Sequence, residues 1–259
     1  RGQGVDIWAD QYPYEATATS LSALVPGWAH EGGVEALLAR LEKAELRERI
    51  MTSIVQELAI RGGPDRVRIA VVKTEKNLCW VGKTIQDVAT GWNVEPAEAV
   101  RQLLLEESAK VNAIYFSIGE VDLEGIITSP IVAVGSDGQA MDPEKDRREN
   151  IHPRSYGTFP RVLGRYVREK VLLSWEAAIY KMTGLPAKIL RMTDRGLLRA
   201  GMKADITVMD PRNVMDRADF VNPHQYPSGI QHVFVNGIPA VRDGKLTGCG
   251  RGRVLRKNK

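Results

Sequence analysis

Residues 131–138 read Ile-Val-Ala-Val-Gly-Ser-Asp-Gly, an apolar run that ends in an acid between glycines. A short apolar run closed by glycine is typical of a buried strand. In α/β barrels the chemistry lies at the C-terminal ends of strands, because each strand fixes a side chain while the following loop adapts to the substrate. We therefore predict that Asp137 stands at a strand end, where it can bind a metal or transfer a proton. An aspartate that caps the loop or the next helix is an equally good interpretation.

Other apolar runs predict further strands, and helical periodicity separates most of them. Strands are expected at residues 5–9, 67–72, 113–116 and 131–134, and helices at 34–58, from 96 onward, at 159–167 with Pro160 in the first turn, and after Ser174. This alternation favours an α/β fold with parallel strands. We expect residues 1–193 to form the C-terminal part of a TIM-like (β/α) barrel, with a helical excursion at about 28–62.

The residue pattern of the sequence changes after about residue 193, where glycines alternate with short apolar runs. Asn236 and Gly237 separate two such runs, which is the strongest short-range signal for a β-hairpin. We expect residues 194–259 to form a small β-sandwich domain.

The composition of the chain argues against several classes of function. The chain has 259 residues, 43% of them hydrophobic, and a formal net charge of +4. The basic residues of the last nine positions suggest a solvated tail, and no basic surface interleaved with aromatics predicts a nucleic-acid partner. No stretch approaches the roughly 20 apolar residues needed to span a bilayer. Cys79 and Cys249 are too few for a disulfide framework or a thiolate zinc site.

The four histidines of the chain do not predict a complete metal site, because none is paired at a spacing of two or four residues. His152, fifteen residues beyond Asp137, is of interest because it shares a loop with Arg154. An arginine can bind a substrate carboxylate through two parallel hydrogen bonds. A surface ion pair is the alternative interpretation of Arg154. The sequence contains no glycine-rich phosphate loop, no Gly-x-Ser-x-Gly elbow and no Cys/His dyad.

Several motifs resemble one known family. They are Ala9-Asp10-Gln11-Tyr12-Pro13-Tyr14, the strand ending Gly135-Ser136-Asp137-Gly138, the block from His152 to Arg161 that continues to Tyr166, the stretch Met182-Thr183-Gly184-Leu185-Pro186-Ala187, and residues 194–205. Together they are similar to the D-aminoacylases (N-acyl-D-amino-acid deacylases) of the amidohydrolase superfamily, and the similarity runs through essentially the whole chain.

The resemblance implies a metal-dependent hydrolase that cleaves the amide bond of N-acyl-D-amino acids, with Zn²⁺ activating a water. It implies that Asp137 binds the metal and acts as general base and then acid. Arg154 would hold the substrate carboxylate, and His152 would support the same loop. Tyr12 and Tyr14 would complete the substrate-binding residues, near the metal or the acyl group.

The chain departs from the family pattern in what precedes its first motif. Family members carry a His-x-His pair, a bridging cysteine or equivalent, and a further strand-end histidine ahead of this segment, and the sequence has none of these. It also has Ile118 where the family tends to have Met. We expect the chain to be the C-terminal portion of such an enzyme, completed by a partner chain or by a missing N-terminal segment, and to hold zinc only weakly alone.

Two alternatives remain open at this point: a non-catalytic amidohydrolase-like module, or one half of a split enzyme that needs a partner chain. An open sheet edge would favour such association. A cytoplasmic location is our default expectation. We expect the sequence to open in the middle of a fold, in which case the lack of a leader says nothing about the compartment.

Overall fold

The strands form three separate sheets in the computed structural model, which describes residues 4–142, 144–250 and 252–256. The strands are β1 (Ala9–Gln11), β2 (Thr17–Ser20), β3 (Val67–Val71), β4 (Asn112–Tyr115), β5 (Val132–Val134), β6 (Ile206–Met209), β7 (Ile230–Val235), β8 (Ile238–Arg242) and β9 (Lys245–Leu246). β1 pairs with β5, β4 lies between β2 and β3, and β6 to β9 follow one another in order.

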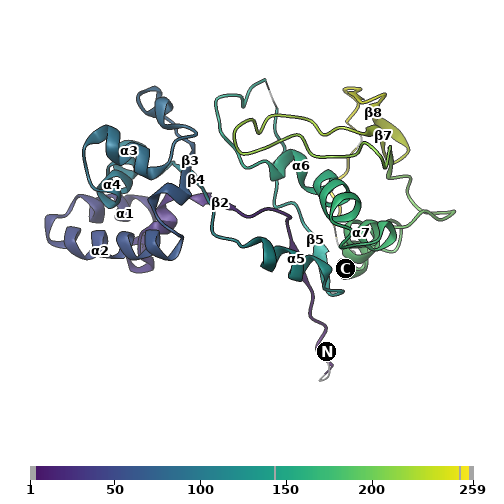
Figure 1. The fold of residues 1–259 in the computed structure, drawn as a ribbon, viewed down its shortest axis with the longest axis horizontal. Coiled ribbons are helices and arrows are strands. Elements are labelled where there is room, and N and C mark those ends of the chain that lie inside the picture. Colours follow the sequence, from purple (N-terminus) through teal and green to yellow (C-terminus); the bar gives the residue numbers. More distant parts are fainter. Residues whose placement is uncertain (1–3, 143, 251, 257–259) are drawn as a thin grey trace.

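Helices cover most of the remaining chain. The α-helices are α1 (Gly33–Glu42), α2 (Ala44–Ile60), α3 (Ile85–Trp92), α4 (Pro96–Glu106), α5 (Glu120–Thr128), α6 (Arg154–Arg161), α7 (Trp175–Met182) and α8 (Gly184–Ile189). Shorter segments are η1 (Leu21–Leu24), η2 (Gly27–His30), η3 (Pro64–Arg66), η4 (Glu75–Trp80) and the π-helical η5 (Val162–Glu169). Figure 1 shows α1 to α4 gathered at one end of the molecule and α5 to α7 toward the other.

The two strands that lead to the candidate site lie side by side. β1 and β5 run parallel, with Asp10 opposite Ala133. The buried strand predicted at 131–134 is confirmed, since all three residues of β5 are buried. The strand predicted at 5–9 is wrong: β1 begins at Ala9, and Val5 and Ile7 are each 55% exposed. These two side chains pack against little of the described chain, so an apolar run alone did not make a buried strand there.

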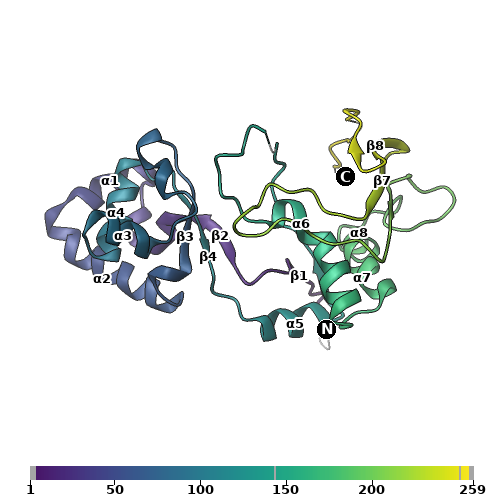
Figure 2. The same ribbon diagram turned by 45° about the horizontal axis from the view of Figure 1, so that its top comes forward.

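The helical end of the molecule has its own core. Buried residues of α1 and α2, spaced three and four apart as the sequence predicts for 34–58, join buried residues of α3 and α4. One face of the sheet β2-β4-β3, including Val67, Ile69 and Tyr115, belongs to this core. The opposite face contributes Ala70 and Ile114 to a smaller cluster with Phe220. The sheet therefore joins the helical unit to the rest of the chain, as Figure 2 shows.

The parallel arrangement predicted for the strands at 67–72 and 113–116 is wrong. β3 and β4 are neighbours, but they pair antiparallel. Two packed helices, α3 and α4, lie in the connection between them, so it is not the single-helix crossover that would return a parallel strand. The sequence analysis identified only the helix from Pro96 onward. The signal it missed is the capping box of Thr84 and Asp87, which begins α3.

The second core lies around η5 and α7, where Val162, Tyr166 and Ala178 are buried with Val134 of β5. Pro160 is the seventh residue of α6, not a first-turn residue as predicted, because the helix already begins at Arg154. A proline at this position removes one helical hydrogen bond, and the chain continues directly into π-helical η5. Ser174 is confirmed as the N-cap of α7, since its hydroxyl accepts from the Ala177 N–H.

The C-terminal strands form one antiparallel sheet. The hairpin predicted at Asn236-Gly237 is confirmed: it joins β7 to β8, and both turn residues have positive φ, 51° and 80°. Residues 252–256 of the predicted solvated tail are exposed, whereas residues 251 and 257–259 lie outside the described part of the chain. Within the described ranges, no helix is both long and apolar enough to cross a membrane.

A buried carboxylate stabilises the turn after β3. Glu107 is only 1% exposed and accepts from the backbone N–H of Lys73 (2.6 Å) and of Thr74 (2.9 Å), and from Asn77 Nδ2 (2.7 Å). Burial raises the pKa of Glu107, but these hydrogen bonds outweigh burial and lower it.

We predict that Glu107→Gln lowers the free energy of unfolding by about 1.5–3 kcal/mol at pH 7, because an amide cannot accept all of these donors. The lowered pKa means that the ionised carboxylate stabilises the fold above its unfolded pKa, and that this contribution is lost as pH falls through the folded pKa. The difference in unfolding free energy between wild type and variant, measured by urea unfolding, should be smaller at acid pH than at pH 7. Glu106→Gln is the control, since Glu106 is more exposed and pairs with Lys76; an equal loss in both variants would contradict the prediction.

Candidate active site

Asp137 follows β5 at the end that lies beside β1. The Gly135 N–H donates to the Gln11 carbonyl (3.1 Å), which keeps the chain against β1 until two residues before Asp137. Asp137 has a φ of 45°, a left-handed conformation that aspartate tolerates better than most residues. Its carboxylate lies 2.8 Å from Arg154 Nη2 and is 69% exposed. Among the described residues no backbone N–H donates to this carboxylate, so a loop-capping role has no support in its contacts.

Arg154, the first residue of α6, is held on several sides. Its side chain is only 10% exposed, its guanidinium lies 4.9 Å from the Tyr12 ring centroid, and Nη2 also donates to the Ala18 carbonyl at 3.4 Å. A Cβ on Gly138 would come within 2.9 Å of the Ser155 Cα, so the loop after Asp137 packs tightly on the start of α6. The cation and the acid are thus brought together by two segments of fixed backbone.

His152 contacts both the chain after β1 and the start of α6. Its Nε2 lies 2.9 Å from the Ala16 carbonyl, and the Arg154 N–H donates to its Nδ1 at 3.0 Å. Since a carbonyl can only accept, the proton is on Nε2 and Nδ1 is the acceptor. Burial lowers the pKa of His152 to about 3. His152 is therefore a neutral structural residue that ties the chain after β1 to the start of α6.

The two tyrosines predicted for the site differ in position. Tyr12 is half-buried beside Arg154, and burial raises its pKa, although the neighbouring guanidinium opposes this. Tyr14 is 1% exposed, and its ring lies 5.1 Å from that of His152. Burial raises the pKa of Tyr14 as well. Tyr12 can reach a ligand at Arg154, whereas Tyr14 contacts the site through His152.

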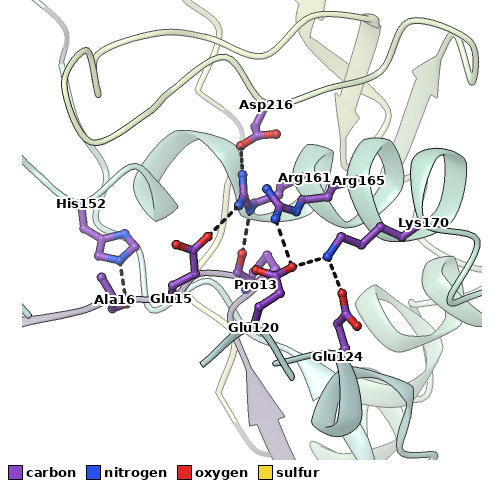
Figure 3. Close-up of polar contacts among 10 residues, drawn as sticks. All are labelled: Pro13, Glu15, Ala16, Glu120, Glu124, His152, Arg161, Arg165, Lys170 and Asp216. Carbon is purple, nitrogen blue, oxygen red and sulfur yellow. Dashed lines mark hydrogen bonds and ion pairs between the residues drawn. The ribbon is translucent and has the colours of Figure 1, made fainter. Parts of the chain in front are cut away.

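Arg161 positions the candidate site, although in the sequence it stands out only as the end of a motif. Figure 3 shows it between two distant segments: Nε donates to the Pro13 carbonyl (2.7 Å) and Nη1 to Asp216 Oδ2 (3.1 Å). Its guanidinium also lies 4.7 Å from the Tyr14 ring centroid. Burial raises the pKa of Asp216, and Arg161 counteracts that shift. Arg161 therefore fixes the Tyr12-Pro13-Tyr14 segment against α6.

A second ion-pair group continues along the same helical stretch. Glu120 accepts from Arg165 (3.0 Å) and Lys170 (2.5 Å), and Lys170 also pairs with Glu124. Figure 3 shows how these pairs join η5 to α5, the helix that precedes β5. The helical stretch that begins at Arg154 is thus also connected to α5, the helix that precedes β5 and the loop of Asp137.

The described residues do not form a metal site by themselves. Across residues 4–142, 144–250 and 252–256 there is no group of three or more histidines, cysteines or acids that could hold a metal ion. Asp137 offers one carboxylate, and its partner is a cation. Asp10 lies on the neighbouring strand, where its Oδ1 would be 3.3 Å from a Cβ on Gly135. Asp137 can serve as one ligand, but a complete set requires donors from elsewhere.

Comparisons with known proteins show to which family the chain belongs. A model of the amidohydrolase family matches residues 3–241. The chain belongs to the amidohydrolase family. It is 43% identical over 250 residues to an N-acyl-D-aspartate deacylase of Alcaligenes xylosoxydans xylosoxydans, covering 96% of this chain and 40% of that protein. The amidohydrolase chain therefore spans about two fifths of the length of this relative.

Solved structures show the same relationship. The chain aligns with an N-acyl-D-glutamate deacylase from Bordetella bronchiseptica, complexed with zinc and a phosphonate inhibitor, at 32% identity and a TM-score of 0.68, covering 95% of this chain and 42% of that one. It aligns with a D-aminoacylase at 30% identity and a TM-score of 0.74, covering 99% and 44% of the two chains. The resemblance to the D-aminoacylases is confirmed.

The buried neutral state of His152 predicts a pH effect on stability. Because its pKa is lowered to about 3, the unfolded chain, with a pKa of about 6.5, binds a proton that the folded chain does not. Stability conferred by the neutral ring is therefore present above pH 6.5 and is lost as pH falls toward 3, by up to about 1.4 kcal/mol per pH unit.

We expect urea unfolding between pH 7 and pH 5 to show this decline in the wild type and a smaller decline in His152→Asn. His30→Asn is the control, because His30 is only partly buried and lies in the helical unit. An unchanged pH slope in His152→Asn would show that the ring is protonated in the folded protein.

Proposed function

We propose that this chain is part of an enzyme that hydrolyses the amide bond of N-acyl-D-amino acids, and that Asp137 and Arg154 belong to its active site. The observation that carries the proposal is the 2.8 Å pair of a strand-end acid and a nearly buried arginine. Relatives and structural neighbours described as deacylases of this kind support it, over almost the whole of this chain.

The proposed fold of the active protein extends what is described here. We propose that β1 and β5 are strands of a TIM-like (β/α) barrel to which residues 1–193 contribute, and that residues 194–259 contribute to a small β-sandwich. The parallel pairing of β1 with β5 and the acid at the end of β5 support the first part. The antiparallel sheet of β6 to β9 supports the second.

Arg154, Tyr12 and Asp137 have different roles in the proposed reaction. Arg154 binds the substrate carboxylate with its guanidinium fork, and the Tyr12 hydroxyl lies within reach of the same group. A carboxylate on Arg154 competes with Asp137 for the cation and so releases the acid. Asp137 then takes a proton from the attacking water as its oxygen bonds to the acyl carbon, and delivers that proton to the amine nitrogen as the C–N bond breaks.

Zinc is the metal we propose for the complete site, supported by the zinc in the N-acyl-D-glutamate deacylase structure. When bound, such a metal acidifies a water and polarises the amide carbonyl. Asp137 would be one of its ligands, and the others would come from a partner chain or from another segment of the same protein, because the described residues supply no further set.

A second candidate function is a non-catalytic module, or one half of a split enzyme. The lack of a metal-binding group within the described ranges favours it. Metal analysis of the complete gene product, and an assay of it with N-acetyl-D-aspartate, N-acetyl-D-glutamate and N-acetyl-D-methionine, separate the two. Stoichiometric zinc with amide hydrolysis supports the enzyme, and a metal-free inert protein supports the module.

We predict that Asp137→Ala in the complete gene product lowers kcat by at least about 100-fold, since proton transfer by a positioned acid contributes this much. Folding should be nearly unchanged, because the carboxylate is largely exposed. Steady-state kinetics and thermal unfolding provide the measurements, with the exposed Asp65→Ala as control. Turnover within a few-fold of wild type would refute the role given to Asp137.

We predict that Arg154→Lys raises KM by about tenfold or more and changes kcat less, because an ammonium replaces a two-pronged contact with a single point charge. Arg199→Lys, at an exposed position, should leave both constants unchanged. An unaltered KM in Arg154→Lys would mean that the substrate carboxylate binds elsewhere.

A further inference from the structure

The loop after Asp137 turns back onto α6, the helix that begins at Arg154. In the proposed reaction a substrate carboxylate takes the place of the Asp137 carboxylate on the guanidinium of Arg154. The ion pair, which measures 2.8 Å, then no longer holds the acid. For Asp137 to keep its position during the reaction, another contact has to fix the backbone around it.

The side chain of Ser155 makes such a contact. Its hydroxyl oxygen accepts from the Gln139 N–H at 3.2 Å, which ties the backbone two residues beyond Asp137 to the first turn of α6. Ser155 is itself held in that turn, because its own N–H donates to the His152 carbonyl at 3.3 Å. Neither hydrogen bond involves a charged group that a substrate carboxylate would bind. The link between loop and helix therefore does not depend on the partner of Arg154.

The backbone of the turn shows why this link is needed. Asp137 has a φ of 45°, a conformation that costs energy for residues other than glycine and persists only where surrounding contacts support it. A Cβ on Gly138 would lie 2.9 Å from the Ser155 Cα, so the turn lies directly against α6. The Ser136 hydroxyl accepts from the Gly138 N–H at 3.2 Å, but both groups belong to the turn itself. The Ser155 hydroxyl, in contrast, joins the turn to the helix that carries Arg154.

We propose that Ser155 is a positioning residue for Asp137. Its hydroxyl holds the loop so that the acid stays beside the reacting atoms after Arg154 has bound the substrate, and it does not contact the substrate. This inference rests on the function proposed above, because it concerns the step in which Asp137 transfers a proton. A displacement of about 1 Å is enough to slow such a step strongly. Binding of the substrate carboxylate by Arg154 does not require the hydroxyl.

Steady-state kinetics of the complete gene product with N-acetyl-D-aspartate, N-acetyl-D-glutamate and N-acetyl-D-methionine test the proposal. We expect Ser155→Ala to lower kcat by about tenfold and to leave KM within about twofold, because the acid is displaced while Arg154 is not. Ser155→Thr keeps a hydroxyl on the same Cβ and should restore most of kcat. Ser53→Ala is the matched control, since Ser53 is also a partly buried helical serine, but its hydroxyl donates to the Arg49 carbonyl within α2.

Hydrogen exchange, measured by mass spectrometry on the same proteins, gives a second result that does not need turnover. The Gln139 amide should exchange about fivefold faster in Ser155→Ala than in the wild type, as expected for the loss of one hydrogen bond. Ser155→Thr should return its exchange toward the wild-type rate. The amides of α2 should exchange as in the wild type, which shows that the variant is folded.

The two measurements separate failure of this inference from failure of the proposed function. If the wild type hydrolyses none of the three substrates, the proposed function has failed, and the exchange of Gln139 still decides whether Ser155 holds the loop. An unchanged kcat or an unchanged Gln139 exchange rate in Ser155→Ala overturns the inference. So does a KM that rises as much as kcat falls, because Ser155 would then act on substrate binding by Arg154. A Ser155→Thr enzyme as slow as Ser155→Ala would overturn the role of the hydroxyl.

Discussion

The guanidinium of Arg161 is the contact on which the candidate site depends. β1 is three residues long and pairs only with β5 among the described strands, so this pairing alone does not fix the chain beyond Gln11. Arg161 supplies what is missing by donating to the Pro13 carbonyl while Asp216 compensates its charge. A buried charge without such a partner is costly, and a buried pair loses several kcal/mol when one member is removed. The segment that carries Tyr12 and Tyr14 is thus held to α6 by an interaction whose loss would strongly destabilise the fold.

A neutral histidine connects the segment held by Arg161 to Arg154, one of the two residues that we propose for the active site. His152 accepts from the Arg154 backbone and donates to Ala16, so it connects the same two segments a second time. Its neutrality matters because a protonated ring could no longer accept from the Arg154 N–H. Arg154 is then positioned by backbone contacts and by Tyr12, and its guanidinium does not need to reorganise when an anion arrives. Asp137 is the exposed member of the pair and the one that is free to change partners.

The sequence predicted the features that depend on local pattern. The buried strand β5, the acid after it and the Asn236-Gly237 turn each follow from a few adjacent residues, and the family motifs pointed to Arg154. Features set by tertiary contacts were missed or wrong. The direction of β4 depends on how α3 packs on α4, which no single segment encodes. The pairing of Arg161 with Asp216 joins residues 55 positions apart, and only the folded chain brings them together. Val5 and Ile7 were predicted to belong to a buried strand, but no packing buries them.

Two arginines illustrate how the surroundings assign different roles to one chemical group. Arg161 faces an acid that is 6% exposed, so its charge is permanently compensated and its role is structural. Arg154 faces an acid that is 69% exposed, so water and competing anions can displace that partner, which is what a substrate-binding cation needs.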